Sequence, residues 1–233
     1  MDVDECRLVG VTDDLGAAAD ADALADYVEF RLGSAENPRA QLSNYTEAVP
    51  LVLSPRAATR EGDALDPDEV ASIAAAAPPG TVETVEIEAA HAADRPDVLE
   101  RLRELGVQLL ISSYDEEKTP PRGELKRTIA ECRKYGDLVK IVVRVEDEGD
   151  ALTLLECLND ASKDGVSVAG YGSGAAGRHT RVISAFYGSR LVYAPIRPDE
   201  CSGEISLKQL GNVLDTITNT NGIECESELA DSL

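Results

Sequence analysis

The feature that most constrains the fold is the alternation of short apolar runs with segments of helical spacing. Eight runs rich in β-prone residues recur, at residues 8–12, 27–32, 50–54, 82–88, 107–112, 138–143, 166–169 and 191–194. Helices are expected between them: Asp66 before Pro67 is typical of a helix start, and residues 121–135 carry Leu125 and Ile129 four positions apart. This alternation predicts an α/β chain folded as a single-domain (β/α)8 TIM barrel. A doubly wound sheet is the alternative, but no predicted strand leads into a glycine-rich dinucleotide fingerprint.

The barrel is expected to occupy residues 1–218. The remaining segment, 219–233, is polar and acidic, which predicts a mobile C-terminal tail. The stretch 170–177 is rich in glycine but lacks the lysine of a phosphate-binding loop, so it carries little information by itself.

The charge balance indicates a protein adapted to high salt. Acidic residues number 44 against 22 lysines and arginines, and they are spread along the whole chain. Such a surface repels itself unless counterions screen it, and it disfavours nucleic acid and anionic membranes as partners. The acidic N-terminus does not resemble a signal peptide, so we expect a cytoplasmic protein. A small anionic substrate held by arginines and a homodimer both remain compatible with this composition.

The cysteines and histidines argue against a metal site. The five cysteines form no CxxC pair, and His91 and His179 are the two histidines of the chain. A zinc site with the usual ligand spacing is therefore not expected.

Lys140 is the candidate for chemistry. It lies in an apolar run, 138–143, and shares a strand face with Leu138 and Val142. A buried ammonium must be paired, reach water or lose its proton, and burial lowers the pKa of a lysine. A neutral lysine attacks ketones and forms a Schiff base. The competing interpretation is a lysine with a packed stem and a solvated head.

Other polar residues are predicted to gather at the same end of the barrel. Glu29 and Arg31 share one face of the second predicted strand, and Glu86 and Glu88 share one face of the fourth. Inward polar residues at the carboxyl ends of barrel strands are typical of an active site, although any one pair taken alone is better explained as a buried ion pair.

Several motifs together resemble the type I 3-dehydroquinate dehydratases, a Schiff-base family on a (β/α)8 barrel. The segment from Glu29 to Arg31 resembles the family's Glu-x-Arg, and the segment around Lys140 resembles the strand of its imine-forming lysine. Glu61 and the following glycine resemble the start of Glu-Gly-Gly, with Arg56 one residue away from the spacing of a substrate-binding arginine. The segment from 174 to 181, followed by Gly-Ser, resembles the motif whose arginine, here Arg181, holds the substrate carboxylate.

The departures from the family pattern concern proton transfer and substrate binding. An ungapped alignment places Tyr114 where the family has its catalytic histidine, whereas a gapped alignment deletes that histidine. Glu204 replaces a substrate-binding glutamine, and Glu200 replaces a serine at the same rim. Tyrosine has a pKa near 10 and suits proton transfer at neutral pH only where cations depress that value. Glu61, which orients the histidine in the family, is the alternative base.

The resemblance implies dehydration of 3-dehydroquinate to 3-dehydroshikimate in the shikimate pathway, without metal or external cofactor. It implies catalytic roles for Lys140, Tyr114 and Glu61. The substrate-binding residues that it implies are Glu29, Arg31, Arg56, Arg181, Glu200 and Glu204. Two alternatives stay open at this point: another Schiff-base lyase or aldolase on the same barrel, and a catalytically silent relative that binds a metabolite.

Overall fold

The computed structural model describes residues 6–21, 23–57, 64–198 and 204–218. It contains an eight-stranded parallel sheet in the order β7-β6-β5-β4-β3-β2-β1-β8. The strands are β1 (Arg7–Thr12), β2 (Tyr27–Arg31), β3 (Leu51–Ser54), β4 (Val82–Glu88), β5 (Gln108–Asp115), β6 (Leu138–Arg144), β7 (Val168–Ser173) and β8 (Leu191–Pro195). All eight predicted strands are confirmed.

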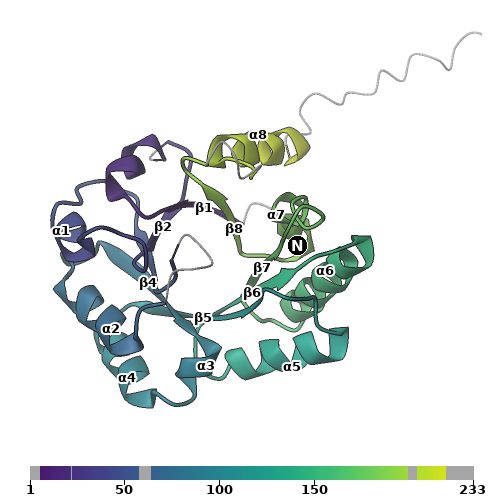
Figure 1. The fold of residues 1–233 in the computed structure, drawn as a ribbon, viewed down its shortest axis with the longest axis horizontal. Helices are drawn as coiled ribbons and strands as arrows, with labels where there is room; N and C mark the ends of the chain where they lie inside the picture. The colour runs from purple at the N-terminus through teal and green to yellow at the C-terminus, as the bar shows by residue number, and fades with distance from the viewer. Residues whose placement is uncertain (1–5, 22, 58–63, 199–203, 219–233) are drawn as a thin grey trace, which may run out of the picture.

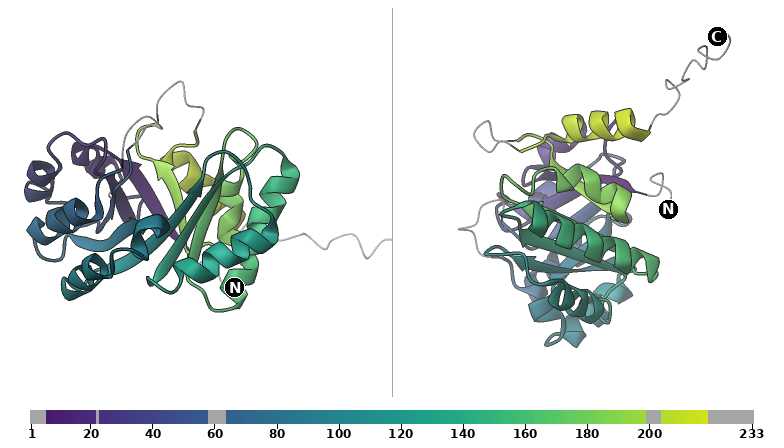
Figure 2. Two further views of the ribbon diagram at one scale, coloured as in Figure 1. Left: turned by 60° about the horizontal axis from the view of Figure 1, so that its bottom comes forward. Right: turned by 90° about the vertical axis from the view of Figure 1, so that its right-hand side faces the viewer.

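The sheet curls into a barrel that closes between β7 and β8. A parallel bridge joins Val168 to Ser189, and the Arg190 N–H donates to the carbonyl oxygen of Val168 at 2.7 Å. Seen down its axis, the barrel has strands around its centre and helices outside them (Figure 1). Figure 2 shows the same arrangement from the side. The predicted (β/α)8 barrel is confirmed, and the doubly wound alternative is wrong.

The helices follow the strands as the alternation predicted. They are α1 (Pro38–Ser43), α2 (Pro67–Ala76), α3 (Ala89–Ala92), α4 (Pro96–Glu104), α5 (Arg122–Cys132), α6 (Glu148–Lys163), α7 (Thr180–Ile183) and α8 (Leu207–Thr218), with 3-10 turns at Leu15–Asp20 and Ser184–Tyr187. Asp66 caps α2, because its carboxylate accepts the Asp68 N–H at 2.9 Å and Pro67 opens the helix. Within the described residues, no helix is long and apolar enough to cross a membrane.

The glycines near position 170 belong to a strand and not to a phosphate-binding loop. β7 runs through Gly170 and Gly172 to Ser173, four residues past the predicted end. A Cβ on Gly170 would lie 2.8 Å from the Ile141 carbonyl oxygen, and a Cβ on Gly172 would lie 2.4 Å from Val145. These glycines therefore allow β7 to pack closely on its neighbours.

Two apolar clusters lie on the two faces of the barrel wall. The larger one packs the outward side chains of the strands, such as Val28, Phe30 and Ile87, against the helices. The smaller one fills the interior and includes Val9, Leu110 and Tyr193. The charged side chains that point inward, together with aromatic residues of this smaller cluster such as Tyr171 and Tyr193, form the candidate site. The predicted tail, 219–233, lies outside the described residues.

Candidate active site

The barrel interior contains a layer of charged side chains from alternate strands. Lys140 of β6 is 1% exposed, and its Nζ donates to Glu29 Oε2 of β2 at 2.6 Å and to Glu86 Oε2 of β4 at 3.1 Å. Tyr193 of β8 completes the layer, with its ring centroid 4.3 Å from the Lys140 Nζ. Side chains from every second strand meet at one level of a (β/α)8 barrel, which explains why these distant residues touch.

Pairing, and not solvation, satisfies the Lys140 ammonium. Burial lowers the pKa of Lys140, but the Glu29 and Glu86 carboxylates raise it by more, so this pKa lies well above its ordinary value. The interpretation with a solvated head is wrong, because the head is buried. The lowered pKa that burial alone suggested is also wrong for the unliganded site. Lys140 is an ammonium there and must give up a proton before it can attack a carbonyl group.

Glu29 accepts hydrogen bonds from two cations, Arg31 and Lys140. Its Oε1 accepts a hydrogen bond from Arg31 Nε at 3.2 Å, while its Oε2 accepts from Lys140. Burial raises the pKa of Glu29, but Lys140 and Arg31 together lower it by more. Both oxygens of Glu29 are therefore occupied beneath the pocket, although the resemblance implied that this carboxylate contacts substrate.

Tyr114 is joined to the same network through Glu86. Its hydroxyl donates to Glu86 Oε1 at 2.7 Å. Burial and the Glu86 carboxylate raise the pKa of Tyr114 well above its ordinary value, despite the nearby Lys140. The Arg56 guanidinium stacks on the Tyr114 ring, 3.9 Å from its centroid. The pKa of this phenol therefore lies above its ordinary value even though Lys140 lowers it, which disfavours Tyr114 as a base. Its catalytic role stays a prediction.

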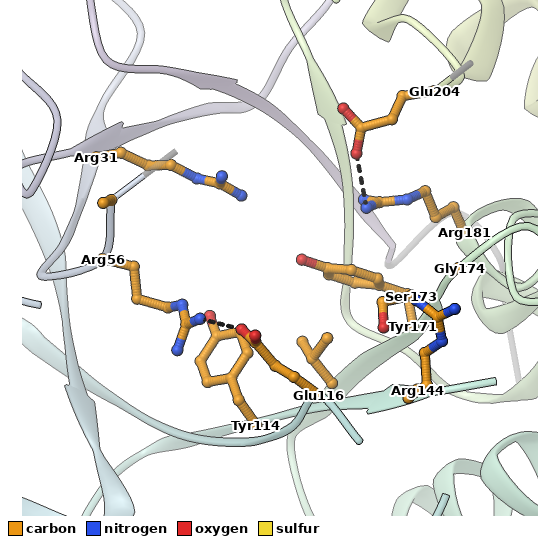
Figure 3. A pocket seen from close by; sticks show the side chains of 12 residues that line it. Arg31, Arg56, Tyr114, Glu116, Arg144, Tyr171, Ser173, Gly174, Arg181 and Glu204 are labelled. Carbon is orange, nitrogen blue, oxygen red and sulfur yellow. Dashed lines mark hydrogen bonds and ion pairs between the residues drawn. The ribbon is translucent and has the colours of Figure 1, made fainter. Parts of the chain in front are cut away.

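A cavity of about 280 Å³ opens above this layer at the carboxyl ends of the strands (Figure 3). Four arginines line it: Arg31, Arg56, Arg144 and Arg181. Arg31 and Arg56 approach it from one side, and Arg181 with Glu204 from the other (Figure 3). The cavity is therefore suited to a small anion.

Three of the four arginines are held by other residues. Arg31 binds Glu29, as described above. Arg56 bridges Glu88 Oε1 at 3.1 Å and Glu116 Oε1 at 2.5 Å. Arg181 donates to the Tyr193 carbonyl oxygen at 3.1 Å and to Glu204 Oε1 at 3.3 Å, and it stacks on Tyr171.

Arg144 is different. Within the described part of the chain, its guanidinium makes no hydrogen bond or ion pair, and it lies against Gly174. It is therefore a cation of the cavity that is available to a ligand.

The structure brings most of the predicted site residues together. Lys140 and Glu29 lie beneath the cavity, and its walls include Tyr114, Arg31, Arg56, Arg181 and Glu204. Glu61 and Glu200 lie outside the described residues, so the structure places neither of them.

Sequence reasoning assigned no role to Glu86, Glu116 or Arg144. The alternation of side chains held the signal for two of them: Arg144 shares a strand face with Lys140 and Val142, and Glu116 follows Tyr114 by two positions. Glu86 was recognised as pointing inward, but no pattern along the chain shows that it meets both Lys140 and Tyr114.

Comparison with known proteins agrees with this geometry. The sequence model of type I 3-dehydroquinase matches residues 6–221. This chain belongs to the type I 3-dehydroquinase family. A 3-dehydroquinate dehydratase of Halobacterium salinarum is 34% identical over 86% of this chain and 91% of the relative. One from Haloquadratum walsbyi is 30% identical over 93% of this chain and 94% of the relative.

Solved structures support the family fold. The 3-dehydroquinate dehydratase of Geobacillus kaustophilus superposes with a TM-score of 0.79 at 18% identity, covering 92% of each chain. The curated relatives named above are haloarchaeal, which fits the salt adaptation that the acidic composition predicted.

Proposed function

We propose that this type I 3-dehydroquinase converts 3-dehydroquinate to 3-dehydroshikimate and water through a Schiff base on Lys140. Membership in the family supports the reaction. The observation that carries the role of Lys140 is its place in the barrel: a lysine 1% exposed, held by two carboxylates, below a cavity lined by four arginines. A lysine buried at the floor of a cavity can react with a bound substrate while the barrel excludes bulk water from the reacting atoms.

The first step is imine formation. Lys140 passes one proton to a carboxylate that it already contacts, Glu29 or Glu86, and its free amine adds to the C3 ketone. The carbinolamine then loses its hydroxyl as water, with the proton that the carboxylic acid returns, and the protonated imine remains. Its positive charge replaces that of the ammonium between Glu29 and Glu86, so the layer keeps its charge balance throughout.

The second step is elimination. A base removes a proton from C2, and the two electrons of that bond move toward the imine nitrogen. They return to form the C1–C2 double bond as the C1 hydroxyl leaves as water with a proton from an acid. Hydrolysis of the imine releases the product and regenerates Lys140.

The arginines bind the anionic substrate. We assign its carboxylate to Arg181, and its hydroxyls to Arg31 and Arg56, all of which line the cavity. Glu204 orients Arg181, because its Oε1 accepts a hydrogen bond from the Arg181 guanidinium at 3.3 Å. The further substrate contacts implied by the resemblance, at Glu29 and Glu200, stay predictions, and so do a cytoplasmic location and a homodimer.

Trapping of the intermediate tests this proposal. Borohydride added with 3-dehydroquinate in high salt is expected to add one reduced ligand mass, which peptide mapping places on Lys140. The Lys140→Met variant is expected to give neither adduct nor turnover. An adduct on Lys118, or none on an enzyme that turns over, contradicts the proposal.

A further inference from the structure

The elimination needs a proton carrier, and the described walls of the cavity restrict the choice. Arginine does not exchange protons near neutral pH, which excludes the four guanidinium groups. Tyr114 already donates its proton to Glu86, and its raised pKa disfavours the phenolate that a base would require. Among the described residues of the wall, the remaining carboxylates are Glu116 and Glu204.

Glu116 lies on the same side of the cavity as Lys140, because it directly follows β5 and Lys140 belongs to the neighbouring strand β6. It follows the end of β5, whose inward residues Ser112 and Tyr114 pair in register with Lys140 and Val142 of β6. Its side chain points into the cavity beside Tyr114 (Figure 3). Glu204 precedes α8 and reaches Arg181 on the opposite side of the cavity (Figure 3). A base must lie within about 3 Å of the proton-bearing carbon, next to the imine, and this requirement favours Glu116.

The surroundings of Glu116 also fix its position. Its Oε1 accepts from the Arg56 guanidinium at 2.5 Å, and that guanidinium is held in turn by Glu88 and by stacking on Tyr114. The Glu116 side chain is nevertheless 37% exposed, so it remains open to a ligand in the cavity. A carboxylate that is oriented by an arginine and still accessible is suited to proton transfer.

We propose that Glu116 is the general base and acid of the elimination, a role that rests on the proposed dehydratase function. The carboxylate takes the C2 proton and becomes a carboxylic acid while the electrons move to the imine. It then gives the same proton to the C1 hydroxyl, which leaves as water. Because C1 and C2 are bonded to each other, one carboxylate reaches both atoms.

A pair of amide variants tests the proposal. Glu116→Gln is expected to lower kcat by about 10²–10⁴-fold, the usual worth of acid–base assistance. It is expected to keep borohydride trapping at Lys140 but to stop exchange of the C2 hydrogen with deuterated solvent. The matched control, Glu117→Gln, changes the exposed neighbour and is expected to leave kcat within about twofold of the parent.

The pH profile separates proton transfer from mere positioning of Arg56. Glu116→His is expected to restore part of kcat and to move the acid limb of the kcat/KM profile upward, toward the histidine pKa near 6.5. A purely structural role gives no such shift. A circular dichroism spectrum like that of the parent confirms that each variant is folded.

Five results overturn the inference or its foundation. Turnover of Glu116→Gln above one tenth of the parent rejects Glu116 as base, and so does solvent exchange that persists. Loss of trapping together with turnover assigns Glu116 to substrate binding through Arg56 instead. Loss of exchange in Glu61→Gln, with exchange kept in Glu116→Gln, moves the role to Glu61. Absence of trapping in the parent enzyme refutes the Schiff-base function itself.

Discussion

Replacement of Lys140 by methionine tests the buried charge layer most directly. The side chains of Lys140, Glu29 and Glu86 are 1%, 2% and 0% exposed, and the ammonium contacts the two carboxylates at 2.6 and 3.1 Å. Removal of the ammonium leaves two carboxylates in the interior without their shared cation. Loss of one partner from a buried ion pair costs about 3–5 kcal/mol, which corresponds to a fall in Tm of roughly 6–20 °C at about 2–4 °C per kcal/mol for a chain of this size.

The effect is expected to depend on pH. Glu29 has a lowered folded pKa, so it stabilises the parent fold above its unfolded pKa, near 4.3, and this contribution is lost as pH falls through the folded value. Lys140 has a raised folded pKa, so it stabilises below about 10.4, and this contribution is lost as pH rises through the folded value. In Lys140→Met the two carboxylates repel each other, and protonation of Glu29 at low pH relieves that repulsion. The difference between parent and variant is therefore largest near neutral pH and shrinks toward pH 4.

Urea denaturation at constant molar salt measures this difference. Adding Glu29→Gln and Glu86→Gln to Lys140→Met removes the buried charges and is expected to restore much of the lost free energy of unfolding. Lys163→Met changes an exposed lysine and is expected to stay within about 0.5 kcal/mol of the parent. A Lys140→Met variant as stable as the parent at neutral pH, with no dependence on pH, shows that the layer is not ionised as described.

Three further predictions concern the cavity and the surface. Tyr114→Phe removes the hydrogen bond to Glu86 and is expected to cost about 1–3 kcal/mol of stability. Turnover is expected to persist, because the raised pKa disfavours the phenol as base, and loss of turnover in folded protein contradicts this. Arg144→Met removes a cation of the cavity and is expected, in steady-state assays, to raise KM about tenfold with little change in kcat. The control Arg178→Gln changes an arginine outside that cavity and is expected to leave KM unchanged. With a net charge of -22, the fold is expected to loosen well below about 1 M salt, and a Tm that is flat from molar salt to dilute buffer refutes that expectation.

The sequence determined the barrel and the direction of its side chains. Local alternation of apolar residues located all eight strands, because each strand must bury one face against helices and turn the other inward. The same periodicity placed Glu29, Glu86 and Lys140 on inward faces. It could also have found Arg144, which lies four positions after Lys140 and therefore on the same face of the strand.

The tertiary structure decided what these side chains meet. Lys140 contacts carboxylates 111 and 54 positions away in sequence, and closure of the sheet sets these distances. The pKa of Lys140 therefore rises where burial alone predicted a fall, because two charges from distant strands outweigh desolvation. Likewise the resemblance aligned Tyr114 with the family histidine, but only the fold shows that the Tyr114 hydroxyl donates to Glu86 and that Glu116 lines the same cavity. Pairing between strands, and not the order of residues along one strand, fixes the protonation state of each group.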